Sequence, residues 1–107
     1  MIEEAARALA REIENSPEAQ AYRTAKEAAM GESQTAALLE RFLELRQRLQ
    51  ARQLLGTAED ATEQQEFSKL GELLQFYPLA AQFLRAEYDL QGLLSKVYAI
   101  LAETSLL

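Results

Sequence analysis

The sequence contains neither cysteine nor histidine among its 107 residues. Without cysteine it cannot form disulfides, thiolate zinc sites, Cys-ligated iron–sulfur clusters or a thiol nucleophile. Without histidine it lacks the commonest general base and the commonest transition-metal ligand, so neither a Ser-His-Asp triad nor a Glu-x-x-His di-iron site can be built. We therefore expect no catalytic residue, no cofactor and no bound metal.

Residues that favour strands and loops are scarce as well. The chain has one valine, three isoleucines, four glycines and two prolines, against 19 alanines and 19 leucines. This composition favours helices and disfavours strands. The hydrophobic share of 49% and the charged share of 26% are typical of a soluble protein. The length is that of one domain, so we expect a single all-α domain over residues 1–107.

The charge and the apolar runs argue against nucleic acid and membrane as direct partners. The formal net charge of −6 repels nucleic-acid phosphate and anionic lipid. The longest uncharged run, residues 73–84, is too short to span a bilayer. The N-terminus, Met1-Ile2-Glu3-Glu4, is acidic where a secretory signal is basic. These features predict a cytoplasmic protein.

Helix-breaking residues divide the chain into five predicted helices. Ser16 followed by Pro17 predicts a helix start, Gly56 predicts a helix end, and Pro78 predicts the start of the last helix. Thr62 is expected to cap the fourth helix after a short loop over residues 57–62. The predicted boundaries are 2–15, 17–29, 33–55, 62–76 and 78–104.

Two of these helices carry strong apolar periodicity. In 78–104, apolar residues alternate at spacings of four and three from Leu79 through Leu90 to Ile100, as in a coiled-coil seam. A similar pattern begins at Leu38 in 33–55. At 1.5 Å per residue the last helix is about 40 Å long, longer than a compact chain of this size is wide. The periodicity predicts an elongated antiparallel hairpin of 33–55 with 78–104, flanked by the shorter helices.

The apolar arc of the last helix is wider than one partner helix needs. Exposed apolar surface of this kind usually marks an interface, and a second copy of the chain is the commonest partner. We therefore expect a homo-oligomer, a dimer or a larger assembly. Its interface is expected to include Phe83, Leu90, Leu94, Val97 and Leu101.

A carboxylate-based metal site or active site is the alternative. Glu87 falls inside the apolar arc, where burial would raise its pKa and suit it to acid–base work. Glu40 and Glu44 lie four residues apart and could bind a hard cation. The simpler interpretation is that Glu87 pairs with an Arg or Tyr of another helix and that Glu44 pairs with Arg48.

Three arginines form a basic stripe beside the apolar seam of 33–55. Arg41, Arg48 and Arg52 fall within a narrow arc of that helix. They are candidates for contact with an acidic partner surface or RNA phosphate. Alternatively, they pair with the abundant glutamates of a neighbouring helix.

Three tyrosines lie at helical spacing from apolar neighbours. We expect Tyr22, Tyr88 and Tyr98 to belong to the core rather than to a site.

Several motifs resemble one family of small helical bacterial proteins. The segments Leu9-Ala-Arg-Glu-Ile13, Ser16-x-Glu18 and Tyr22-x-x-Ala25 are similar to the opening of the YlbF/YmcA family. The resemblance continues through Ala36-Ala37-Leu38-Leu39-x-x-Phe42, Gly56 and Pro78-x-x-x-x-Phe83-x-x-Ala86-Glu87-x-x-Leu90. It covers nearly the whole chain. The chain departs from the family at Tyr77, where asparagine usually precedes the proline.

The resemblance implies a non-enzymatic helical protein that forms homo- or hetero-oligomers. Members of the family resemble adaptor subunits that work with ribonuclease Y in mRNA maturation, and so influence competence, sporulation and biofilm formation. The implied partners are proteins of the same family or an RNA-processing complex. Some relatives bind iron–sulfur clusters through cysteines, a property that this cysteine-free chain cannot share.

Overall fold

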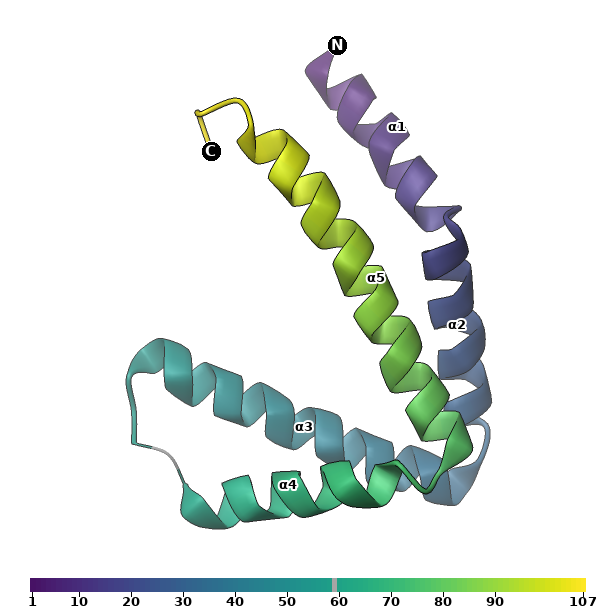
Figure 1. Ribbon diagram of the computed structural model, residues 1–107, viewed down its shortest axis with the longest axis vertical. Coiled ribbons are helices and arrows are strands. Elements are labelled where there is room, and N and C mark those ends of the chain that lie inside the picture. The colour runs from purple at the N-terminus through teal and green to yellow at the C-terminus, as the bar shows by residue number, and fades with distance from the viewer. Residues whose placement is uncertain (59) are drawn as a thin grey trace. The chain divides into compact units, whose positions relative to one another are not determined.

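The computed structural model describes residues 1–58 and 60–107, and nearly all of them lie in five α-helices (Figure 1). The helices are α1 (Ile2–Glu14), α2 (Pro17–Met30), α3 (Ser33–Leu55), α4 (Ala61–Leu74) and α5 (Pro78–Ala102). The described residues contain no strand. The all-α prediction is confirmed, and the predicted boundaries agree with the observed ones to within two residues. No helix in the described part of the chain has the length and apolarity that crossing a membrane requires.

Ser16 begins a helix and Gly56 ends one, as the sequence predicts. The Ser16 Oγ accepts a hydrogen bond of 3.1 Å from the backbone N–H of Ala19, in the first turn of α2. The same hydroxyl donates to the carbonyl of Ile13 over 2.6 Å, so it joins the end of α1 to the start of α2. Gly56 ends α3 in the left-handed conformation, with φ of 68°, which glycine adopts without steric cost.

Acidic side chains cap the two middle helices. The Glu32 carboxylate accepts from the backbone N–H of Gln34 and Thr35 at the start of α3, at 3.1 and 2.8 Å. Asp60 does the same for α4, accepting from Thr62 and Glu63 at 2.9 and 3.2 Å. The prediction that Thr62 caps α4 is therefore wrong. The carboxylate two residues earlier reaches two orphan amides at once. Glu59, within the predicted 57–62 loop, lies outside the described residues.

The chain divides into two compact units, of which the second comprises Ala28–Gln82. Its centre is an antiparallel hairpin of α3 and α4, joined by a short connection (Figure 1). Phe42 stacks on Phe67 across the hairpin, with ring centroids 4.6 Å apart. A Cβ at Gly71 would lie 3.4 Å from the Phe42 ring, so this glycine lets the two helices approach closely. The buried hydrophobic side chains of this unit are Ala29, Leu39, Phe42, Leu45, Leu74 and Ala80.

Helix α3 takes the next helix in the chain, α4, as its antiparallel partner, a pairing that the sequence analysis did not predict. Apolar periodicity reveals that a helix has a partner but not which helix it is. Because α4 begins only six residues after α3 ends, the sequence separation favours pairing of these two neighbours.

The first unit comprises Met1–Glu27 and Phe83–Leu107. Phe83 is 1% exposed, and its ring lies 5.4 Å from that of Tyr22 on α2. Ala19 and Ala86 are the other buried hydrophobic residues of this unit. No residue of α1 is buried, although its apolar side chains form one stripe. The intrachain core of this unit is therefore small.

Leu45→Ala tests the core of the hairpin. Leu45 is fully buried, so the truncation leaves a cavity and is expected to cost roughly 2–5 kcal/mol of unfolding free energy. Leu54→Ala is the matched control, because Leu54 on the same helix is 89% exposed and its loss should change stability by less than about 0.5 kcal/mol. Urea unfolding followed by circular dichroism measures both. Equal effects would contradict the assignment of Leu45 to the core.

Candidate functional site

Arg41, the first arginine of the basic stripe, pairs with a carboxylate of the facing helix. Its Nε and Nη2 donate to Glu66 Oε2 and Oε1 at 2.7 and 2.9 Å, a bidentate arrangement. The same guanidinium also lies 3.5 Å from Glu44. The side chains of Arg41 and Glu66 are partly exposed at the edge of the hairpin.

Arg48 and Arg52 meet at one glutamate. Arg48 Nη1 lies 3.0 Å from Glu63 Oε2, and Arg52 Nη2 lies 3.1 Å from Glu63 Oε1. Arg48 also contacts Glu44 at 2.8 Å. The Glu63 side chain is only 13% exposed, so both guanidinium groups help to compensate its burial. All three arginines therefore pair within the hairpin. This agrees with the alternative drawn from the sequence, in which they pair with glutamates of a neighbouring helix. We call this set of ion pairs the α3–α4 charge zipper.

Hydrogen bonds shift the pKa values of Arg41 and Glu66 in the zipper and of Glu32 at the start of α3. The bidentate contact with Arg41 holds the pKa of the Glu66 carboxyl below its ordinary value and raises the pKa of Arg41. At the α3 N-cap, the Thr35 hydroxyl and the backbone N–H groups of Thr35 and Gln34 lower the pKa of Glu32. Both glutamates are therefore held in the ionised form, which stabilises structure and does not suit a general acid.

The carboxylates that the sequence offered for metal binding do not form a site. Among the described residues, no group of three or more acidic side chains is placed to hold a metal ion. Glu44 is engaged by Arg41 and Arg48. Glu40 is exposed on α3, and Glu87 is half-buried and has an interaction of its own. Glu40, Glu44 and Glu87 are therefore not grouped around a common ion site.

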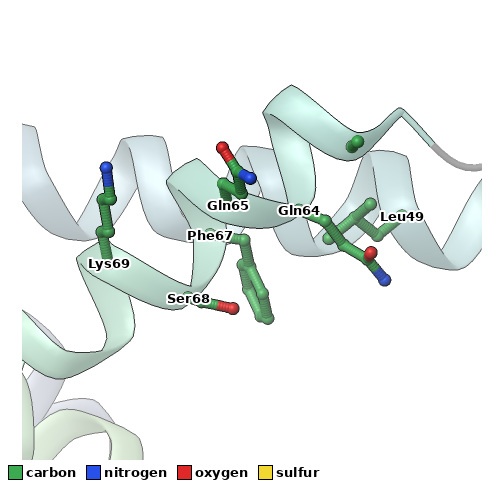
Figure 2. Close-up of a pocket in the computed structure, with 7 residues that line it drawn as sticks. Leu49, Gln64, Gln65, Phe67, Ser68 and Lys69 are labelled. Atoms are coloured by element: carbon green, nitrogen blue, oxygen red, sulfur yellow. The ribbon is translucent and has the colours of Figure 1, made fainter.

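A hollow in the hairpin carries no catalytic constellation among the residues that line it. It has a volume of about 590 Å³ and is lined by Leu49, Ala61, Gln64, Gln65, Phe67, Ser68 and Lys69. Figure 2 shows Phe67 and Ser68 on one side of α4, while Gln65 and Lys69 point to the other side. Lys69, the titratable residue of this lining, points to the other side of α4 from Ser68 and so is not placed as its general base.

The five residues expected at an interface on α5 differ in burial. Phe83 belongs to the core of its own chain, where it packs against Tyr22, so we reassign it from the interface to the core. Leu90, Leu94 and Val97 are half-buried, and Leu101 is 44% exposed. No residue of α5 beyond Ala86 is buried. The remaining four residues, which we call the α5 arc, therefore keep apolar surface available.

The prediction that three tyrosines are core residues holds for only one. Tyr22 is half-buried against Phe83, whereas Tyr88 is 79% exposed and Tyr98 is 68% exposed. Helical spacing from apolar neighbours did not separate them, because α5 is apolar around much of its circumference. Exposed Leu54, Leu55 and Phe76 were also not singled out by the sequence. Each follows or ends a periodic segment, where periodicity carries no information about burial.

Nearly the whole sequence matches a known family. The family described as "Control of competence regulator ComK, YlbF/YmcA" matches residues 2–104. The chain belongs to the YlbF/YmcA family. The match includes both compact units, so the family pattern describes α1 and α5 as well as the hairpin. A search of curated proteins finds no match. The family description names a regulatory role, the control of a competence regulator.

Glu66→Gln tests the zipper through its pH dependence. Because the pKa of Glu66 is lower in the folded chain than in the unfolded chain, its stabilising contribution is complete above about pH 4.3 and is lost as pH falls through the folded-state pKa. The variant should therefore melt at a lower temperature than the native chain at pH 7, and the difference should vanish in acid. Thermal unfolding across a pH series measures this.

Glu40→Gln is the matched control, since Glu40 is exposed on the same hairpin and forms no ion pair with any described residue. A gap between Glu66→Gln and the native chain that persists unchanged at low pH would contradict the electrostatic origin of the effect.

Proposed function

We propose that this chain is a non-enzymatic adaptor or regulatory protein that works as an oligomer, with the α5 arc at the contact between copies. The observation that carries the proposal is the unburied apolar surface of the first unit. Beyond Ala86, where the α5 arc lies, α5 contains no buried residue, and α1 contains no buried residue at all. The family description, which names the control of a competence regulator, supports the regulatory part of the proposal.

Helix α1 supports the same conclusion. It has 13 residues, a length at which an isolated helix is marginal in water and depends on packing of its apolar face. That face carries Ile2, Leu9 and Ile13, of which Ile2 is 86% exposed. A partner that covers the α5 arc and this stripe would supply the packing that the chain itself does not provide.

The chemistry favours a protein partner over nucleic acid. The net charge of −6 opposes direct binding to RNA, and Arg41, Arg48 and Arg52 are already paired within the hairpin. An effect on RNA metabolism would therefore pass through another protein. We propose that the chain acts in the cytoplasm as a subunit that modulates ribonuclease Y-dependent mRNA maturation, and through it competence, sporulation and biofilm formation.

Leu94→Glu tests the contact between copies. The substitution puts an unpaired charge into the centre of the α5 arc, where a desolvated carboxylate is costly. Because Leu94 is only half-buried in the single chain, we expect the fold to survive and the oligomer to dissociate. Light scattering at high micromolar concentration gives the mass, and circular dichroism checks that the helices remain.

The control is Gln91→Glu, which adds the same charge at an exposed position of α5 outside the arc and should leave the mass unchanged. A native chain that stays monomeric at high micromolar concentration would defeat the proposal.

The regulatory role has its own test in the bacterium that carries the chain. Removing the chain should alter the processing of transcripts cleaved by ribonuclease Y, and the native chain should restore it while Leu94→Glu should not. Restoration by Leu94→Glu, with its oligomer shown to be lost, would separate the role from association and contradict the proposal.

A further inference from the structure

Gly92 lies in the middle of α5, and no contact within the single chain requires a glycine at this position. Glycine is the least favourable helix-interior residue after proline. A Cβ at Gly92 would meet nothing within 4 Å, whereas one at Gly71 would touch the ring of Phe42. Packing within the chain thus accounts for Gly71 and not for Gly92. A glycine on an open helix surface is suited to the close approach of another backbone.

The residues around Gly92 form one exposed side of α5. At 100° per residue they lie within about 60° of Gly92 around the helix, on the side opposite Leu94. Tyr88 is the largest of them, and its 79% exposure shows that the chain does not cover it. We call this surface the Gly92 face; its members, all exposed, are Tyr88, Asp89, Gly92, Ser95, Lys96 and Ala99.

A shallow hollow adjoins the Gly92 face. Its volume is about 350 Å³, and it is lined by Glu18, Tyr88, Asp89, Gly92, Leu93 and Lys96. Glu18 comes from α2, so the hollow lies between two helices of the first unit. None of Glu18, Asp89 and Lys96 forms an ion pair with another described residue. The hollow therefore offers two carboxylates and an ammonium group that have no ion-pair partner among the described residues.

The positions of these charges are related by a two-fold axis. An axis perpendicular to α5 between residues 92 and 93 exchanges position 89 with position 96, because each lies three and a half residues, or about 5 Å, from it. Asp89 and Lys96 also lie on the same side of the face. Two antiparallel copies of α5 would thus place each Asp89 opposite the Lys96 of the other copy. An isologous contact requires this self-complementarity.

We propose that the Gly92 face binds the Gly92 face of a second copy, with the two α5 helices antiparallel. The same axis takes position 88 to position 97, midway between Ser95 and Ala99. The Tyr88 ring of each copy would therefore lie over the small side chains of the other. Lys96 of each copy would meet Asp89, with Glu18 beside it, and Gly92 would let the backbones approach.

The charge pattern selects a second copy over a partner of one charge sign. A purely basic partner would be repelled by Lys96, and a purely acidic partner by Asp89 and Glu18. The contact goes beyond the proposed function, because Leu94 and the rest of the α5 arc lie on the other side of the helix. Two self-associating faces on one helix would build an assembly larger than a dimer.

Gly92→Leu and Gly92→Ala test the contact. Since a Cβ at position 92 has open space in the single chain, the fold should persist, and the alanine variant should melt at a higher temperature when dilute. The added side chain separates the two backbones, so Gly92→Leu should raise the dissociation constant of this contact at least tenfold. Analytical ultracentrifugation measures it. Gln91→Leu, an exposed neighbour outside the face, is the control.

A charge exchange tests the register. Asp89→Lys should weaken association by placing two lysines opposite each other, and adding Lys96→Asp in the same chain should restore it. Because the chain has no cysteine, single-cysteine variants test the same pairing directly. An oxidised mixture of Asp89→Cys and Lys96→Cys should form the mixed disulfide several-fold in excess of either symmetric one.

The outcomes separate this contact from the one on the α5 arc. Association that Leu94→Glu abolishes but Gly92→Leu and Asp89→Lys leave unchanged would overturn the Gly92 contact and leave the proposed function standing. The reverse result would support the Gly92 contact alone. A random distribution of disulfides would overturn the antiparallel register.

Discussion

Helix α5 extends for 25 residues, yet its last buried side chain is Ala86. The remaining two thirds of the helix has apolar residues on one side and the Gly92 face on the other, with no described residue fully covering either. Helix α1 is likewise poorly covered, because its apolar stripe has no buried member. Burial of apolar surface is the main force that holds helices in place, and this part of the molecule buries little of it within the chain.

The hairpin of α3 and α4 does not share this dependence. Phe42 and Phe67 stack across it, Leu45 is fully buried, and the α3–α4 charge zipper closes one edge. Since the guanidinium groups and carboxylates compensate one another, that edge has little charge left for a partner. The molecule therefore combines a unit with a well-packed hairpin core and a unit whose buried core is small. This division fits a protein that acts by binding other copies or other proteins.

Much of the fold could be predicted from local signals in the sequence. Ser16, Gly56 and Pro78 determine helix ends through short-range sterics and capping, so the boundaries were predicted closely. The capping residue of α4 was not predicted correctly, because Asp60 and Thr62 are both good capping residues and only the turn geometry distinguishes them. The partner of α3 was also missed, since a heptad pattern is the same whichever helix it faces.

The candidate surfaces were predictable only in part. The apolar arc of α5 was evident from spacing, but Phe83 turned out to be core because Tyr22 approaches it from α2. The role of Arg41 depended on where Glu66 lies, a long-range fact that helical periodicity does not contain. Gly92 gave no sequence signal of its own. Its interest comes from the open space around it in the folded chain.

We propose that association completes the packing of the first unit, whereas the core of the hairpin is packed within the single chain. Amide hydrogen exchange measured at low and high protein concentration tests it most directly. The account predicts that protection in α1 and in residues 90–102 of α5 rises at least tenfold with concentration, while protection around Leu45 and Leu74 in the hairpin stays constant. Protection in α1 and α5 that is independent of concentration, and as high as in the hairpin, would contradict the account.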